Sequence, residues 1–171
     1  MDKIFSGKNI LFGLLLVAFI IVFEIILARL GLPAWPAFMV MIFFFVAHED
    51  VRSAPNIIIG GLAGIACVVL LKEFLQLLGP SLGAEAAKLT FIGLFVYSIV
   101  LLKDAIPYVF NSYAFMFFLV SALAAKEPGH PVPYVWMAVE LVVGSVFIAG
   151  ILGMNRIVAA VLEKNKQGIK T

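Results

Sequence analysis

The stretch ILFGLLLVAFIIVFEIILARL at residues 10–30 contains only two charged side chains, Glu24 and Arg29, and no proline. A helix that crosses a bilayer needs roughly 20 consecutive, mostly apolar residues, which is the length of this run. The run is longer than the apolar core of a cleavable signal peptide, and it carries a charge inside. We therefore expect residues 10–30 to form the first membrane span.

The rest of the chain has the same apolar character. Of its 171 residues, 64% are hydrophobic and 13% are charged, and the mean hydropathy is +1.15, which argues against an ordinary soluble protein. Five more apolar runs follow, at 33–46, 55–78, 89–102, 106–125 and 133–154, and the second and fourth of the six spans are short. The sequence thus predicts an all-α integral membrane protein with six transmembrane helices, in a single transmembrane domain over 1–171.

The basic residues predict the orientation in the membrane. If both termini are cytoplasmic, the cytoplasmic side carries more Lys and Arg than the outer side, as is typical of membrane proteins. The cytoplasmic set is Lys3, Lys8, Arg52, Lys103, Arg156, Lys164, Lys166 and Lys170, and the outer set is Arg29, Lys88 and Lys126. We therefore expect a basic cytoplasmic tail at 157–171. Short loops on both sides favour a bacterial inner membrane, with an organelle as the alternative, and the scattered charges argue against nucleic-acid binding.

Short matches recur at offsets of 77 or 78 residues, from the second span to the start of the third. They are Ala37-Phe38-Met39 with Ala114-Phe115-Met116, Ala47 with Ala125, Glu49 with Glu127, and Pro55 with Pro133. If the repeated unit has three spans, an odd number, the second copy enters the membrane from the opposite side. We therefore expect two inverted three-helix repeats, at about 8–80 and 85–156. A shared composition rich in Ala and Phe is the alternative explanation.

The second and fifth spans correspond to each other in this scheme. Many secondary transporters consist of inverted repeats and bind substrate between them, on helices that are short or interrupted. Pro33 and Pro107 lie near the starts of the two spans, although proline is also tolerated in the first turn of an ordinary helix. That alternative does not explain why a polar residue, Asn111, follows Pro107 within the apolar run. Asn111 and Ser112 are therefore candidates for a solute pathway.

Three charged residues, Glu24, Lys72 and Glu140, lie at a similar expected depth. Each is about 7 to 11 Å below the outer end of its span. Charges at such depth normally face the interior of the helix bundle and pair with each other. Lys72 would pair with Glu24 or Glu140, which leaves one carboxyl to hold a proton that moves with substrate. In the alternative, the flexible stem of Lys72 carries its charge to the membrane surface.

Other residues complete the set of candidates. Asn56 and Asn111 would each line the pathway or bond between helices, and His48 would respond to cytoplasmic pH or belong to a solvated helix cap. Small residues that permit close helix packing are Gly60, Gly64, Gly144 and Gly150. Two histidines and one cysteine, Cys67, form no cluster of metal ligands, so we expect neither a metal nor a cofactor.

The second and third spans carry a series of motifs. These are Leu32-Pro33-Ala34-Trp35-Pro36-Ala37-Phe38, a run ending in Phe45-Val46-Ala47, and Asn56 followed by Gly60 and Gly64. The series resembles the YcdZ-like small bacterial inner-membrane proteins, which implies six spans without implying a function. A Trp-led span before a Gly-rich one is more distantly similar to the membrane half of fusaric-acid-resistance and aromatic-acid exporters. The large cytoplasmic part and the basic run of those exporters are missing here, and neither resemblance carries over a binding residue.

The sequence favours a small-solute transporter or channel, with proton coupling at Glu140 or Glu24. Lys72 would act as a counter-ion or attract an anion. The alternative is a non-transporting subunit or anchor whose buried charges pair with a partner protein. We expect the lipid bilayer and further copies of the chain, in a homo-oligomer, as partners. No catalytic residue is predicted, because no nucleophile has a base in reach, so we do not expect an enzyme.

Overall fold

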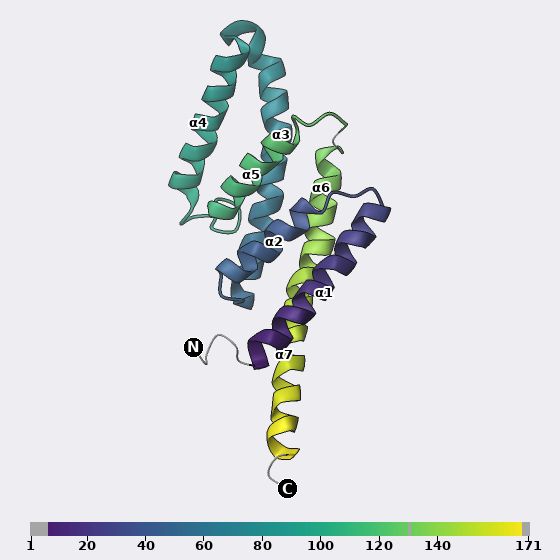
Figure 1. Cartoon of the computed structure of the whole chain (residues 1–171). Coiled ribbons are helices and arrows are strands. Elements are labelled where there is room, and N and C mark those ends of the chain that lie inside the picture. The colour runs from purple at the N-terminus through teal and green to yellow at the C-terminus, as the bar shows by residue number, and fades with distance from the viewer. Residues whose placement is uncertain (1–6, 130, 169–171) are drawn as a thin grey trace.

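The computed structural model describes residues 7–129 and 131–168, the last five of them by their backbone alone. Every regular element in these residues is helical. The elements are α1 (Gly7–Arg29), α2 (Trp35–Val46), the 3-10 turn η1 (Val51–Ser53), α3 (Ala54–Leu82), α4 (Ala84–Leu102), α5 (Ser112–Ala124), α6 (Pro133–Val139), the π-helical turn η2 (Glu140–Gly144) and α7 (Ser145–Gly168). Because α6, η2 and α7 follow one another without a break, they form one long helix, called the α6–α7 helix below (Figure 1).

Prolines and a glycine define several helix boundaries. The helices α2, α3 and α6 each have a proline in the first turn, where the missing N–H is not needed. Gly83 separates α3 from α4 with a φ of +83°, a conformation that other residues rarely adopt. All six predicted apolar runs therefore contain a helix.

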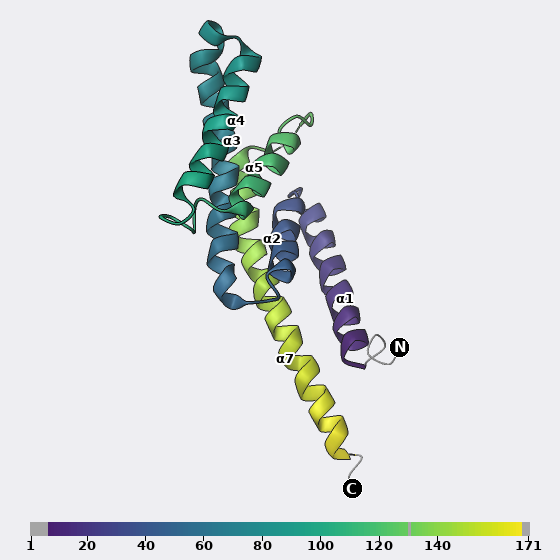
Figure 2. The ribbon, with the colours of Figure 1, turned by 90° about the vertical axis from the view of Figure 1, so that its left-hand side faces the viewer.

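Successive helices run in alternating directions. The helix α1 begins at the same end of the molecule at which the α6–α7 helix ends, and the turn between α3 and α4 lies at the opposite end (Figures 1 and 2). The two short helices, α2 and α5, lie in the middle. The order of lengths is thus long, short, long in the first half of the chain and again in the second.

Four helical segments are long and apolar enough to cross a membrane: α1, the segment Val51–Leu82, α4, and the segment Pro133–Glu163. The other two, α2 and α5, have 12 and 13 residues. At 1.5 Å per residue they are only about 18 and 20 Å long, against a hydrocarbon core of about 30 Å. Large apolar side chains such as Leu14, Ile21, Leu94 and Val100 are exposed on α1 and α4, as expected of helices that face lipid.

The helix contacts cross between the first and second halves of the chain. The helix α3 packs mostly against α4 and α5, which follow it, whereas the α6–α7 helix packs back against α1 and α2. The long helices α3 and α6–α7 also touch each other. One buried core joins α2, α3, α5 and the α6–α7 helix, and its largest side chains include Phe44, Ile57, Phe117, Trp136 and Phe147. The helix α4 packs in a second, smaller cluster, where Phe95 meets Val68 and Phe118.

The predicted lengths of the fourth and fifth spans are wrong. The fourth helix is not short, because α4 begins at Ala84 and has 19 residues. The fifth begins only at Ser112, six residues later than predicted. Residues 106–110 are apolar but form turns, and the residue before Pro107 is disfavoured in a helix. The side chain of Asn111 then caps α5 by accepting a bond from the Ala114 N–H, which fixes the start of the helix.

Candidate functional site

Glu140 is the central residue of the candidate site. It is fully buried (0% exposed), and neither carboxyl oxygen has a hydrogen-bond partner in the part of the chain that the structure describes. An ionised carboxyl that is buried without a partner is very costly, so such a group is held neutral by a proton or neutralised by a cation. The prediction that Glu140 faces the interior of the bundle is consistent with this burial.

The room for the Glu140 side chain comes from a glycine on the neighbouring long helix. A Cβ atom on Gly61 of α3 would lie 2.7 Å from Glu140 Cδ and 2.8 Å from Cε2 of Phe117. Real Cβ atoms essentially never come this close to another heavy atom. The carboxyl of Glu140 and the ring of Phe117 on α5 therefore meet above the bare backbone of α3.

Two further glycines of α3 continue this close approach toward α5. A Cβ atom on Gly60 would lie 2.5 Å from Asn111 Oδ1, and one on Gly64 would lie 2.8 Å from the Phe118 backbone nitrogen. Small residues at such positions let two helix backbones come together. The predicted packing roles of Gly60 and Gly64 agree with these contacts.

The glycines of the last helix have separate partners. A Cβ atom on Gly144 would lie 2.8 Å from Cγ2 of Val40 on α2, and one on Gly150 would lie 2.5 Å from Cζ of Phe19 on α1. These contacts agree with the predicted packing roles of Gly144 and Gly150. The α6–α7 helix thus approaches α1 and α2 through glycine, as α3 approaches α5.

Glu140 begins the π-helical turn η2, which ends at Gly144. Single π-turns inside α-helices are rare and are often found at functional sites, because the extra residue changes the direction of the side chains and disturbs the regular hydrogen bonds. Gly144 lies against α2, so the irregular turn is located where the α6–α7 helix contacts both α2 and α3. No feature of the sequence indicated this turn.

The Phe117 ring, which lies beside Glu140 at Gly61, belongs to a series of aromatic rings from three helices. The Trp35 and Trp136 rings have centroids 5.5 Å apart, and Trp35 is 6.5 Å from Phe117. Phe43 continues the series, 5.8 Å from Phe117 and 5.1 Å from Tyr113. These five rings, called the aromatic cluster below, join α2, α5 and α6.

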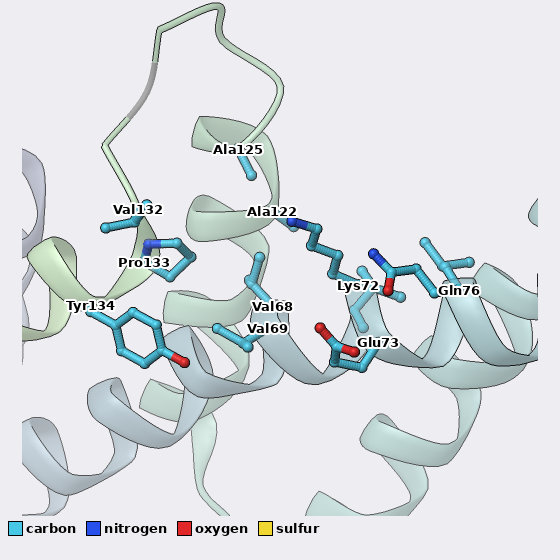
Figure 3. A pocket seen from close by; sticks show the side chains of 12 residues that line it. Val68, Val69, Lys72, Glu73, Gln76, Ala122, Ala125, Val132, Pro133 and Tyr134 are labelled. Atoms are coloured by element: carbon cyan, nitrogen blue, oxygen red, sulfur yellow. The ribbon is translucent and has the colours of Figure 1, made fainter.

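A groove of about 710 Å³ lies between α3, the end of α5 and the start of α6 (Figure 3). Its polar lining consists of Lys72, Glu73, Gln76 and Tyr134, and the rest is apolar. The ammonium group of Lys72 extends toward Ala122, whereas the Glu73 carboxyl lies on the other side of the Lys72 stem. No ion pair joins these two neighbours, because the one ion pair in the described residues is Lys88 with Glu85.

The groove lies in line with Glu140. Val68 lines it from α3 and Pro133 from α6, and each is seven residues from the point where Gly61 meets Glu140. Seven residues of helix correspond to about 10 Å. Because α3 and α6 run in opposite directions, both displacements lead the same way, and the groove lies about two turns beyond the Glu140 carboxyl (Figures 1 and 2).

The structure does not bring together the three charged residues that share an expected depth. Glu24 and Lys72 are both exposed, on α1 and α3, and neither forms an ion pair within the described residues. Lys72 is eleven residues beyond Gly61 along α3, or about 16 Å from the level of Glu140. The predicted pairing of Lys72 with Glu24 or Glu140 is absent from this structure, since depth along a helix does not determine which face a side chain occupies.

Asn111 connects two helix starts. Its side-chain amide donates to the backbone carbonyl of Asn56 at 3.1 Å and to that of Pro107 at 2.9 Å, while its Oδ1 caps α5. Asn56 contributes its backbone here, and its own Oδ1 is buried with no hydrogen-bond partner among the described residues. Ser112 is exposed. In this structure Asn111 thus has a bonding role between helices, which was one of the two interpretations of the sequence.

His48 lies at the end of α2, with a positive φ of 57°, and its Nδ1 is 3.0 Å from the Val46 carbonyl oxygen. It is exposed, as expected of a helix cap. The next residue, Glu49, accepts a hydrogen bond from Asn155 of α7, which ties the end of α2 to the last helix. No pattern in the sequence indicates that bond. No group of three His, Cys, Asp or Glu side chains in the described residues could hold a metal ion.

Comparisons with protein-family models, with curated proteins and with solved structures find no match to this chain. The interpretation of the site therefore rests on its own geometry. That geometry is a buried carboxyl without a partner, held at the contact of two long helices, close to aromatic rings and below a groove.

Proposed function

We propose that this protein is a proton-coupled transporter of a small solute. In this proposal it has six membrane spans, both termini lie in the cytoplasm of a bacterial cell, and two inverted repeats at about 8–80 and 85–156 enclose the transport site. Glu140 is the residue that binds and releases the proton. The observation that carries the proposal is the complete burial of its carboxyl without a partner.

The two short helices support the repeat. Buried positions of α2 and α5 correspond at the same offset of 77 residues as the sequence match. The pairs are Ala37 with Ala114, Val40 with Phe117, Met41 with Phe118, and Phe44 with Ser121. The same offset thus relates both the sequences and the buried faces. Shared composition explains a similar sequence, but it does not explain why the buried faces have the same register.

The two long helices, α3 and α6–α7, support the inverted repeat as well. Buried positions of α3 and the α6–α7 helix correspond at an offset of 79. The pairs are Ile57 with Trp136, Gly60 with Val139, Gly61 with Glu140, Ile65 with Gly144, and Val68 with Phe147. Residues that correspond in two inverted repeats approach each other only near the symmetry axis between them. The contact of Gly61 with Glu140 is therefore consistent with a site on that axis, where transporters of this kind bind substrate.

The burial of Glu140 also distinguishes the proposal from its main alternative. In a non-transporting subunit, the carboxyl would pair with a cationic group of a partner protein. Here α3, α5 and the α6–α7 helix of the same chain enclose Glu140, so a partner helix cannot reach it without separating them. A proton reaches such a site far more easily than a side chain does.

The groove above Glu140 would be the outer entrance for the solute. It carries one positive and one negative side chain, Lys72 and Glu73, together with the polar groups of Gln76 and Tyr134. Opening of the α3–α6 contact below it would connect the groove with Glu140. A homo-oligomeric state and the resemblance to YcdZ-like proteins remain predictions.

Reconstitution into liposomes tests the proposal. Liposomes with the wild-type protein are exposed to a mixture of amines, amino acids, organic acids and sugars, with a pH gradient in either direction, and uptake is measured by mass spectrometry. We expect at least one solute to move in dependence on the gradient. The Glu140→Gln variant should lose that dependence, because an amide cannot release a proton at this site.

Glu24→Gln is the matched control, because it makes the same substitution at an exposed carboxyl on α1. It should keep the pH dependence of the wild type. The proposal is wrong if the wild type moves none of the solutes, or if Glu140→Gln moves them with unchanged dependence on the pH gradient.

A further inference from the structure

We propose that the transported solute is a monovalent organic cation, which exchanges with the proton on Glu140. This inference rests on the proposed function and names its substrate class. It follows from two properties of the site, namely its charge and the chemical nature of its walls.

The first property is that Glu140 is the only buried charged residue in the described part of the chain, because Glu24, at a similar height on α1, is exposed. The neighbouring helices α2 and α5 carry no charged residue, and the only charges on α3 are Lys72 and Glu73, which lie about 16 Å away. Tyr113 and Cys67 are the other titratable groups on these helices, and both are only partly buried. A lone carboxyl in a medium of low dielectric constant must be neutralised, either by a proton or by a bound cation. An anionic solute would meet a repulsive site.

The second property is that the site offers few oxygen atoms and many aromatic rings. A hard metal cation such as Na⁺ or Mg²⁺ needs several oxygen ligands, and no cluster of acidic side chains exists in the described residues. The ring of Phe117 adjoins the Glu140 carboxyl above Gly61, and the other rings of the aromatic cluster lie beyond it. Aromatic faces attract organic ammonium groups, most strongly where water is excluded.

The exchange balances in charge and atoms. In the enclosed state the carboxyl is protonated and neutral. When a monovalent organic cation enters, the O–H bond breaks, the proton leaves to water, and the carboxylate pairs with the cation. The site is neutral before and after, so neither form leaves an uncompensated charge in the bilayer.

Proton release measures this exchange directly. The purified wild-type protein in detergent and weak buffer is titrated with benzyltrimethylammonium, which combines a fixed positive charge with an aromatic ring. We expect the release of up to one proton for each cation bound, recorded with a pH-sensitive dye. Sodium and 3-phenylpropionate, the second an anion with a similar ring, should release none.

Two variants, each with a matched control, separate binding at Glu140 from binding elsewhere. Glu140→Gln should abolish the proton release, whereas Glu24→Gln should leave it unchanged. Phe117→Leu should weaken binding of benzyltrimethylammonium about tenfold, since it removes the ring beside the carboxyl. Phe91→Leu is its control, because the Phe91 ring packs against Phe74 and Phe118, away from Glu140. The comparison of the three ions in the wild type needs no variant, so a misfolded Phe117→Leu does not prevent a decision.

The inference is wrong if benzyltrimethylammonium releases no proton, or if sodium or 3-phenylpropionate releases as many. Its failure differs from failure of the proposed function. If an uncharged or anionic solute is transported in dependence on the pH gradient and on Glu140, the transporter proposal stands and the substrate class is wrong.

Discussion

Gly61 on α3 lies directly beneath the carboxyl group of Glu140, so that a Cβ atom at position 61 would be 2.7 Å from Glu140 Cδ. The two residues come from different halves of the chain, 79 positions apart. Because any side chain at position 61 would occupy the volume of the carboxyl, Gly61 determines whether Glu140 can remain in its buried position. The glycine is therefore part of the site, in addition to its role in helix packing.

We expect Gly61→Ala to lower the stability of the protein in detergent. Its methyl group would collide with Glu140 and with Phe117, and overpacking of this kind typically costs about 1–3 kcal/mol. Combining it with Glu140→Ala removes the carboxyl and should recover part of the loss, so the two substitutions are non-additive. Thermal unfolding of the purified single and double variants measures both effects.

Gly93→Ala serves as the control for that experiment. Gly93 is an exposed residue of α4, and a Cβ atom there would have no heavy atom within 4 Å. Alanine favours a helix over glycine by about 1 kcal/mol, so this variant should be as stable as the wild type or more so. Equal melting temperatures for Gly61→Ala and Gly93→Ala would contradict the close contact of Gly61 with Glu140.

Gly64 and Gly144 should differ in their tolerance of alanine. A Cβ atom on Gly64 would meet backbone atoms of α5, including the Phe118 nitrogen at 2.8 Å, and backbone cannot move without shifting the helix. The three heavy atoms nearest to a Cβ atom on Gly144 all belong to the side chain of Val40. Overpacking typically lowers the free energy of unfolding by about 1–3 kcal/mol. We expect the loss for Gly64→Ala to lie near the upper end of this range and the loss for Gly144→Ala near the lower end. Thermal unfolding of both variants tests this order, and the reverse order would refute it.

Asn111 should be more sensitive to alanine than to serine. Asn111→Ala removes both the cap of α5 and the bond to the Asn56 carbonyl, and loss of a cap alone costs about 1 kcal/mol. Asn111→Ser keeps a capping oxygen but is too short to reach α3, so its melting temperature should lie between those of the wild type and the alanine variant. A serine variant no more stable than the alanine variant would show that the cap contributes little.

The helices could largely be predicted from the sequence, because each apolar run is bounded by proline, glycine or charge. Hydropathy alone was misleading at residues 106–110, whose apolar side chains lie in turns. Hydropathy measures compatibility with lipid, whereas the start of a helix depends on individual bonds, here the cap formed by Asn111. The third apolar run also ends before its helix does, since α3 continues past Pro80 to Leu82.

The candidate site was predictable only in part. The depth of Glu140 in its span makes it a candidate, since a charge at such depth is costly in a membrane unless it faces the bundle interior. The same reasoning could not separate it from Glu24 and Lys72, whose side chains are exposed. Its contact with Gly61 and Phe117 depends on how α3, α5 and the α6–α7 helix cross, and no local pattern encodes that crossing.

Cysteine labelling should show which ends of the helices face the outside. In a Cys67→Ser background, single cysteines replace Ser81, Lys126, Arg52 and Lys103, all of which are exposed near helix ends. If both termini are cytoplasmic and all six helices cross, a membrane-impermeant maleimide should label positions 81 and 126 in intact bacterial cells. Positions 52 and 103 should react only after permeabilisation. Because α2 and α5 are only about 18 and 20 Å long, against a hydrocarbon core of about 30 Å, the positions beside them test the six spans most directly. If position 52 reacts in intact cells together with position 81, the segment Val51–Leu82 does not cross the membrane between them, and the six-span arrangement is wrong.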